Sequence, residues 1–185
     1  IQKIHDRISS SATRITRIIE SLRRLSVKQS APDARESLRV DDMLPMLTDF
    51  FAERASVTKI ETQFELEAKA ARVRVEPALL RQTFLAVINN SLDAMEATSE
   101  RRLTIRSRAT EEIVEVIIED TGTGIPDEIR DKIFDPFFTT KDPDKGTGLG
   151  LTMAYRAIRD FGGDIAFDRP ANGGARFTLS LPRVK

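Results

Sequence analysis

The chain of 185 residues is long enough for one packed domain with an appendage, and its 40% hydrophobic and 31% charged residues are typical of a globular protein. Its 29 basic and 29 acidic residues leave no net charge, which gives no electrostatic reason to expect nucleic acid as a partner. The lack of cysteine excludes disulfides, thiol catalysis and cysteine zinc sites. The chain begins at Ile1 and has no apolar run that could span a membrane, so we expect a cytoplasmic piece of a longer protein, anchored to a membrane only through upstream segments.

Residues 1–28 carry an apolar stripe in alternating steps of three and four residues, from Ile1 and Ile4 to Leu22 and Leu25. This is the a/d spacing of a coiled coil, and a helix with one narrow apolar stripe needs a partner helix. We expect it to pair in a helical bundle that makes the protein a homodimer; the alternative is an amphipathic helix that docks on its own domain. Polar residues around a proline predict a linker at 29–37, before a second unit at 38–185.

The second unit mixes strand and helix signals without a regular β-α repeat. The expected strands are at 38–40, 59–67, 71–75, two within 101–120, 164–167 and 175–181. The expected helices run from a cap at Asp41 or Asp42 to about residue 55, from Pro77 to about residue 97, and over 150–161. This order favours an α+β fold, a two-layer sandwich in which helices cover one face of a mixed sheet.

One predicted strand ends in a carboxylate beside two glycines. Alternation along a strand places Asp120 on the same face as Val116 and Ile118, at the end of an apolar row. A carboxylate there needs a hydrogen-bond donor or a ligand, and Gly122 and Gly124 leave bare backbone beside it. An adenine, whose exocyclic amine donates hydrogen bonds, suits this arrangement. The same D-x-G-x-G pattern is also typical of an ordinary turn.

The helix expected from Pro77 presents Asn90 on a face of small side chains, which include Thr83 and Ala94, away from its apolar side. The amide oxygen of an asparagine is a hard, neutral ligand of the kind that Mg²⁺ accepts beside phosphates and water. The alternative for Asn90 is a hydrogen bond to neighbouring backbone.

The stretch KDPDKGTGLGLT, residues 141–152, has glycine at every second position before a helix. Gly146, Gly148 and Gly150 leave backbone amides free to face phosphate oxygens, and a helix that begins near Gly150 turns its positive end toward them. Lys141 and Lys145 add positive charge.

The preceding stretch IFDPFFTTK contains three phenylalanines, Phe134, Phe137 and Phe138, in an otherwise polar segment. We expect these rings to anchor a loop that acts as a lid over the glycine-rich stretch.

Four segments in this order, NNSLDAM, DTGTGIP, FDPFFTTK and GTGLGL, resemble the N, G1, F and G2 boxes of the ATP-binding domain of sensor histidine kinases. These kinases belong to an ATPase superfamily shared with DNA gyrase and mismatch-repair proteins. The resemblance implies a Bergerat-type sandwich over residues 38–185 that binds ATP, with Asp120 reading the adenine amine and Asn90 holding Mg²⁺. The ATP-binding residues that it implies are Asn90, Asp93, Asp120, Gly122, Gly124, Ile125, Phe138, Lys141, Lys145, Gly146, Thr147, Gly148, Leu149 and Gly150.

Residues 1–28 resemble the second helix of the dimerisation and phosphoacceptor hairpin that precedes this domain in such kinases. The family's acceptor histidine lies on the first helix, in a pattern like H-[ED]-x-x-x-P. His5 is the single histidine here, and Ser10 stands where that proline belongs. We therefore expect the acceptor histidine to lie upstream, outside this chain.

Two positions depart from the family pattern. Ala86 stands four residues before Asn90, where gyrase-type relatives carry a water-activating glutamate, so hydrolysis by that route is not expected. Asp93 stands where some kinases place a phosphate-binding lysine. The phosphate charge must then be met by Lys141, Lys145 or arginines of the lid.

The resemblance implies a kinase that transfers the γ-phosphoryl group of Mg-ATP to a histidine on the hairpin, for relay to an aspartate of a response regulator. The alternative is an ATP-gated conformational module of the gyrase and mismatch-repair type, in which nucleotide closes a dimer. A serine kinase acting on an anti-sigma antagonist is a third possibility. The F box and the heptad pattern favour the histidine kinase.

Overall fold

The computed structural model describes residues 34–142, 146–171 and 173–184. The heptad pattern at 1–28, and His5 within it, lie outside the described residues, so the predicted dimerisation helix stays a prediction. The described part contains no helix with the length and apolar character that crossing a membrane requires.

The strands of the described residues form one mixed sheet, as predicted. Across the sheet the order is β1 (Glu36–Leu38), β3 (Arg72–Val75), β7 (Arg176–Val184), β5 (Ile113–Asp120), β4 (Arg102–Ala109) and β2 (Glu61–Leu66). The strand β6 (Asp164–Asp168) pairs with β7 beside β3. The pairing of β2 with β4 is parallel, and the other pairs are antiparallel.

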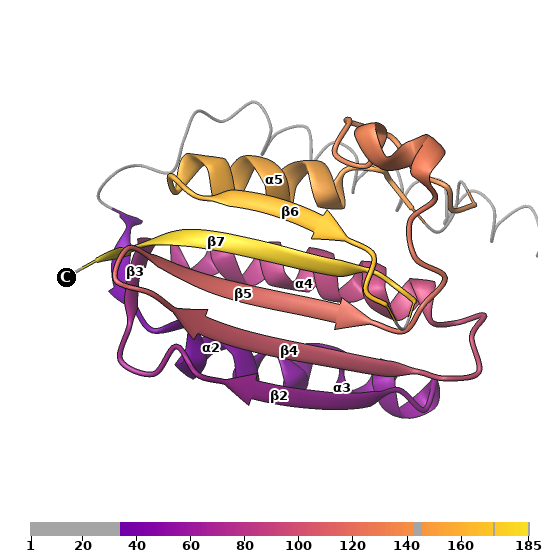
Figure 1. Ribbon diagram of the computed structural model, residues 1–185, viewed down its shortest axis with the longest axis horizontal. Coiled ribbons are helices and arrows are strands. Elements are labelled where there is room, and N and C mark those ends of the chain that lie inside the picture. The colour runs from indigo at the N-terminus through magenta and orange to yellow at the C-terminus, as the bar shows by residue number, and fades with distance from the viewer. Residues whose placement is uncertain (1–33, 143–145, 172, 185) are drawn as a thin grey trace, which may run out of the picture.

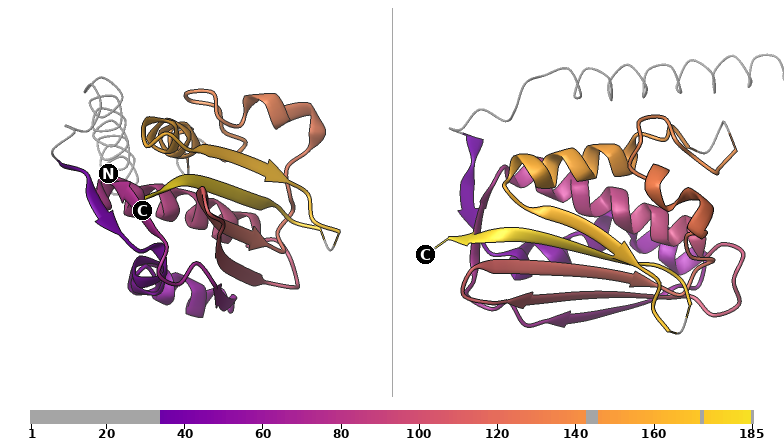
Figure 2. Two further views of the ribbon diagram at one scale, coloured as in Figure 1. Left: turned by 60° about the vertical axis from the view of Figure 1, so that its left-hand side comes forward. Right: turned by 45° about the horizontal axis from the view of Figure 1, so that its top comes forward.

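The four α-helices of the described residues cover one face of this sheet, which makes the predicted two-layer sandwich (Figures 1 and 2). They are α2 (Val40–Met46), α3 (Thr48–Val57), α4 (Pro77–Ala94) and α5 (Gly150–Asp160). The core lies between the layers, where Val116 and Ile118 of β5 and Phe84 and Leu92 of α4 are fully buried. The apolar face of β5 and the apolar stripe of α4 therefore pack against each other, and this packing fixes the position of both elements.

Two expectations near residue 40 were wrong. The strand lies at Glu36–Leu38, because these residues pair with β3, and Val40 already begins a helix. That helix is interrupted at Leu47, soon after Pro45, which has no amide hydrogen to donate. Asp41 does not cap it; its carboxylate accepts hydrogen bonds from the Ser107 hydroxyl and from the Lys69 amide. These tertiary contacts outweigh the local capping preference.

The outer face of the sheet carries ion pairs. Glu119 is 9% exposed and accepts hydrogen bonds from Arg106 at 3.0 Å and from Arg176 at 2.7 Å. Burial acts to raise the pKa of Glu119, but the two guanidinium groups outweigh it and hold that pKa below its usual range. Neighbouring residues Glu119 and Asp120 thus point to opposite faces of β5, one to a charged surface and one to the core side.

Candidate functional site

The segments that carry the motifs meet at one end of the sandwich. There β5 and α4 end, α5 begins, and the chain between β5 and α5 covers this end (Figure 1). The Thr123 amide donates to the Ala94 carbonyl at 3.2 Å, which ties the loop after β5 to the end of α4. A Cβ at Gly122 would lie 2.7 Å from the Ala94 Cβ, so only glycine allows this close approach.

Asp120 is the last residue of β5 at this end of the sandwich, and it is 1% exposed. Its Oδ1 accepts hydrogen bonds from the Gly122 amide at 2.9 Å and from the Ala175 amide at 3.2 Å. Within the described residues, both hydrogen bonds to this carboxylate go to Oδ1, and Oδ2 accepts none. The hydrogen bond to Gly122 forms the turn that was the alternative in the sequence, and it fixes the orientation of the carboxylate.

Burial raises the pKa of Asp120 above its usual range. The charge of Glu119 adds to this rise, while the amides of Gly122 and Ala175 and the hydroxyl of Ser91 oppose it. The carboxylate is therefore held by backbone donors at a place that disfavours its charge. Perturbed carboxylates of this kind are concentrated at functional sites.

Two residues near Asp120 were missed by the sequence analysis. Gly174, at φ +76°, is packed so closely that a Cβ would lie 1.8 Å from the Asp120 carbonyl oxygen. The buried Ser91 hydroxyl lies close enough to Asp120 to lower its pKa, but within the described residues its geometry meets that of no ordinary hydrogen bond. The sequence offers a weak signal for each: Gly174 follows another glycine just before a strand, and Ser91 directly follows Asn90. Neither signal distinguishes a site residue from a turn or core residue.

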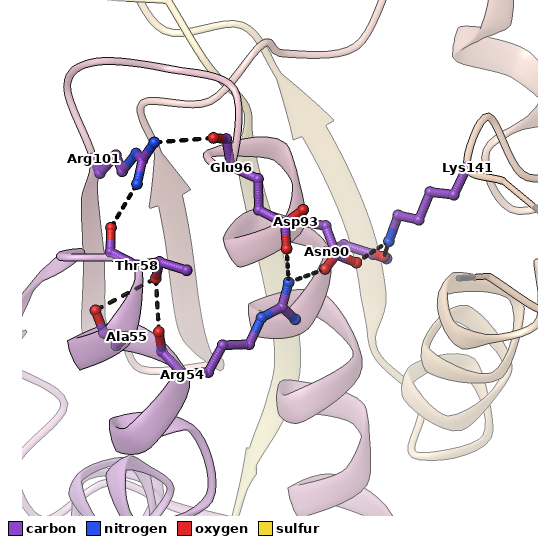
Figure 3. Close-up of polar contacts among 8 residues, drawn as sticks. All are labelled: Arg54, Ala55, Thr58, Asn90, Asp93, Glu96, Arg101 and Lys141. Atoms are coloured by element: carbon purple, nitrogen blue, oxygen red, sulfur yellow. Dashed lines mark hydrogen bonds and ion pairs between the residues drawn. The ribbon is translucent and has the colours of Figure 1, made fainter. Parts of the chain in front are cut away.

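A cluster of charged and amide side chains lies at the other edge of this end (Figure 3). The Lys141 ammonium donates a hydrogen bond to Asn90 Oδ1 at 2.7 Å and also pairs with the Asp93 carboxylate. Arg54 of α3 approaches Asp93 from the opposite side and pairs with Glu96 at 2.8 Å. Three of the predicted residues, Asn90, Asp93 and Lys141, are therefore brought together, and Arg54 is a neighbour that the sequence did not predict.

The glycine-rich stretch packs against the preceding F-box segment through backbone contacts. Gly148 has a φ of +67°, and a Cβ there would lie 2.3 Å from the Phe137 carbonyl carbon. A Cβ at Gly146 would lie 2.8 Å from the Thr139 hydroxyl oxygen. Close packing thus requires glycine at position 148, where the neighbour is backbone, whereas the neighbours of Gly146 are side chains that can move. Lys145 lies outside the described residues.

The aromatic anchor was predicted only in part. Phe134 packs against Tyr155, with ring centroids 5.1 Å apart, and against Phe167 at 6.0 Å. Phe138 is half-buried against the core. Phe137 is not an anchor, because the residue is 52% exposed and its backbone adopts a φ of +67°. The contact with Gly148 uses the Phe137 backbone and leaves the ring at the surface.

The remaining predicted residues lie along the same end but differ in exposure. Leu149 is buried and precedes the first turn of α5, so its side chain belongs to the core. Gly150 begins α5 next to Ala86, whose Cβ lies 3.8 Å from the Cβ position of Gly150. The half-buried residues are Gly124, Ile125 and Thr147. The N-terminus of α5 therefore lies over the middle of α4, one turn from Asn90.

The residues 75–185 match a family model described as "Histidine kinase-, DNA gyrase B-, and HSP90-like ATPase". Among curated proteins, the chain is 38% identical over 122 residues to the sensor kinase CckA of Brucella abortus and 28% identical over 183 residues to the sensor protein FixL of Bradyrhizobium diazoefficiens. These matches cover 66% and 98% of this chain, but the chain spans only 13% and 35% of the two relatives.

Among solved structures, the catalytic domain of the histidine kinase ThkA superposes with a TM-score of 0.70 at 30% identity, over 82% of this chain and 99% of that one. ThkA in complex with the response regulator protein TrrA has the same fold, with a TM-score of 0.76 at 24% identity over 96% of this chain and 49% of that one. The family match covers more than half of the chain and agrees with the sheet, the helices and the four motif segments. The chain therefore belongs to the histidine kinase-, DNA gyrase B- and HSP90-like ATPase family, and its domain is similar to the catalytic domains of histidine kinases.

Proposed function

We propose that the whole protein transfers the γ-phosphoryl group of Mg-ATP to a histidine on a dimeric helical hairpin, for relay to an aspartate of a response regulator. The observation that carries this proposal is the convergence of Asp120, with one oxygen available, and the Asn90 and Lys141 cluster at one end of the sandwich. A ligand with a hydrogen-bond donor at one end and negative charge at the other, such as ATP, matches these two groups.

The Asp120 end is suited to adenine. The two backbone amides on Oδ1 fix the carboxylate, so that Oδ2 can accept a hydrogen bond from the exocyclic amine without reorganisation. The glycines beside it, Gly122 and Gly124, allow the loop to pack closely on Ala94 and Gly174, which fixes the backbone next to the carboxylate. These residues would set nucleotide identity and position.

The Asn90 end is suited to Mg²⁺. The amide oxygen of Asn90 already faces a cation, the Lys141 ammonium at 2.7 Å, and the Asp93 carboxylate lies beside it. Amide and carboxylate oxygens are donors that Mg²⁺ accepts, so the residues present fit the metal, and Asn90 would hold it. Bound Mg²⁺ would neutralise part of the phosphate charge.

Phosphoryl transfer requires positioning and charge neutralisation more than acid-base groups from this domain. In the proposed reaction a nitrogen of the acceptor histidine bonds to the γ-phosphorus, the bond to the β-γ bridging oxygen breaks, and ADP leaves. The backbone amides of Gly146 and Gly148 and the N-terminus of α5 would bind the phosphates. Ala86 cannot activate a water, which weighs against a gyrase-type ATPase.

The partners in this proposal come from the relatives. ThkA has been solved with the response regulator TrrA, and we propose a response regulator receiver domain as the partner of this protein. The heptad pattern at 1–28 supports a homodimer through the helical hairpin.

The test uses γ-labelled ATP with this chain and with a version extended upstream through the first hairpin helix. We expect acid-labile label on the extended chain only. A His5→Gln variant of both chains is the matched control, and it should not change the result. Label on the short chain that disappears in His5→Gln would make His5 the acceptor. Nucleotide binding without label on either chain would overturn the kinase proposal in favour of an ATP-gated module.

A further inference from the structure

The Lys141 side chain is hydrogen-bonded to Asn90 Oδ1, the oxygen that the proposed function assigns to the metal. Its ammonium donates to Asn90 Oδ1 at 2.7 Å and pairs with Asp93, which lies three residues further along α4 (Figure 3). The Lys141 and Asp93 side chains are 29% and 28% exposed, so this ion pair is partly solvated. A partly solvated pair of this kind contributes little to stability and can exchange partners.

Asp93 has a second cation that does not depend on Lys141. Arg54 of α3 pairs with Asp93 and with Glu96, and both partners act to raise the pKa of Arg54 against the opposing effect of burial. The guanidinium therefore stays charged, and its pairing with Asp93 does not use Lys141. If Lys141 leaves, the Asp93 carboxylate keeps a partner, which reduces the cost of its departure.

The ammonium of Lys141 also compensates for the departure from the family pattern at position 93. The resemblance places a phosphate-binding lysine there in some kinases, whereas this chain has a carboxylate. Lys141 is 48 residues away in sequence, yet its ammonium lies at the Asp93 side chain. The positive charge that α4 lacks at position 93 is thus supplied by Lys141, the last residue of the F box.

We propose that Lys141 is an exchangeable phosphate-binding residue: it is held by Asn90 and Asp93, and it moves from them to the nucleotide phosphates when Mg-nucleotide binds. This inference rests on the proposed function. A single amide oxygen cannot contact both an ammonium and a divalent cation without strong repulsion between the two, so Asn90 must release Lys141 to hold Mg²⁺. The phosphates offer Lys141 a more highly charged partner at the same end of the domain.

The exchange makes Asp93 a competitor of the nucleotide for Lys141. Replacing Asp93 by asparagine should weaken this hold and favour transfer of Lys141 to the phosphates. If Asp93 instead positions Lys141 for the phosphates, or serves the metal, the same change should weaken nucleotide binding. The sign of the effect therefore separates the two arrangements.

The experiment is a calorimetric titration of Mg-ADP into the wild-type chain and Asp93→Asn. We expect Asp93→Asn to bind Mg-ADP about threefold to fivefold more tightly, the scale of one partly exposed ion pair. Glu96→Gln is the matched control, because it removes a carboxylate from Arg54 without contacting Lys141, and it should change the affinity much less.

The same substitutions in a Lys141→Met chain show whether any gain in affinity for Mg-ADP depends on Lys141. In Lys141→Met the effect of Asp93→Asn should fall to that of Glu96→Gln, because no ammonium remains to be released. An undiminished gain would mean general charge repulsion and would overturn the exchange, as would weaker binding by Asp93→Asn. Asp93→Ser replaces Asp93→Asn if thermal unfolding shows that the latter does not fold. Failure of the wild-type chain to bind Mg-ADP would instead overturn the proposed function.

Discussion

The two ends of the candidate site are built in different ways. At the carboxylate end, which comprises Asp120, Gly122, Gly124 and Gly174, backbone amides and close backbone packing hold one buried side chain. At the cation end, which comprises Asn90, Asp93, Lys141 and Arg54, long and partly exposed side chains hold each other by charge. The first kind of contact tolerates no added atom, whereas the second can change partners. The domain thus combines a rigid carboxylate end, which we propose recognises the base, with an adaptable cation end, which we propose binds the phosphates.

The largest expected effect is a loss of stability when the close packing at the carboxylate end is disrupted. Gly174→Ala should destabilise the domain by about 3 kcal/mol or more, because its Cβ would clash with the Asp120 carbonyl and the backbone is left-handed. Gly173→Ala is the matched control: its φ of +84° gives similar backbone strain, but nothing lies within 4 Å of its Cβ. We expect only about 1 kcal/mol for it. Urea unfolding of both variants measures the difference, and equal costs would remove the close packing as the cause.

The next effect concerns the cation end and leaves the fold intact. Asn90→Ala should lower the affinity for Mg-ADP about tenfold while leaving the affinity for ADP in EDTA nearly unchanged, because it removes one charge-assisted ligand contact. Asn89→Ala changes the exposed neighbouring residue and should alter neither value. Titration calorimetry with and without Mg²⁺ checks this. A metal dependence that survives Asn90→Ala would assign the metal to another group.

The smallest effect compares two neighbouring carboxylates with opposite pKa shifts. The pKa of Asp120 is raised in the folded chain, so its charged form costs stability once the pH exceeds its folded pKa; Asp120→Asn should therefore keep or increase the melting temperature at pH 7. The pKa of Glu119 is lowered, so its contribution is present above its unfolded pKa and is lost as the pH falls through the folded one.

Glu119→Gln should accordingly cost about 1 kcal/mol at pH 7 and less at low pH, because it leaves Arg106 and Arg176 without their shared partner. Thermal unfolding of both variants across pH 3–7 makes the comparison. Destabilisation by Asp120→Asn together with stabilisation by Glu119→Gln would reverse the assigned signs.

Much of the fold could be predicted because its signals are local. The helix expected at 150–161 is observed at Gly150–Asp160, and the helix expected from Pro77 begins at that residue. The alternation that placed Asp120 on the buried face of β5 was confirmed by the burial of Val116 and Ile118. Periodicity predicts these features since each follows from neighbours within one element.

The errors and omissions depend on contacts between distant segments. The strand at Glu36–Leu38 is defined by its pairing with β3, and the exposure of Phe137 depends on the path of the backbone against Gly148. The contact of Lys141 with Asp93 joins an F-box segment to a helix. Local patterns carry no information about such pairs. Most residues of the cation end could therefore be predicted from the sequence, but the contacts between them could not.

The most direct test of the account is a titration of Mg-ADP into the wild-type chain and Asp120→Asn. We expect binding at one site in the wild type and an affinity about tenfold to a hundredfold lower in Asp120→Asn, because a charged hydrogen bond to the adenine amine is removed. The melting temperature of the variant should be no lower than that of the wild type. Equal affinities in two folded proteins would contradict the assignment of Asp120 to the nucleotide site.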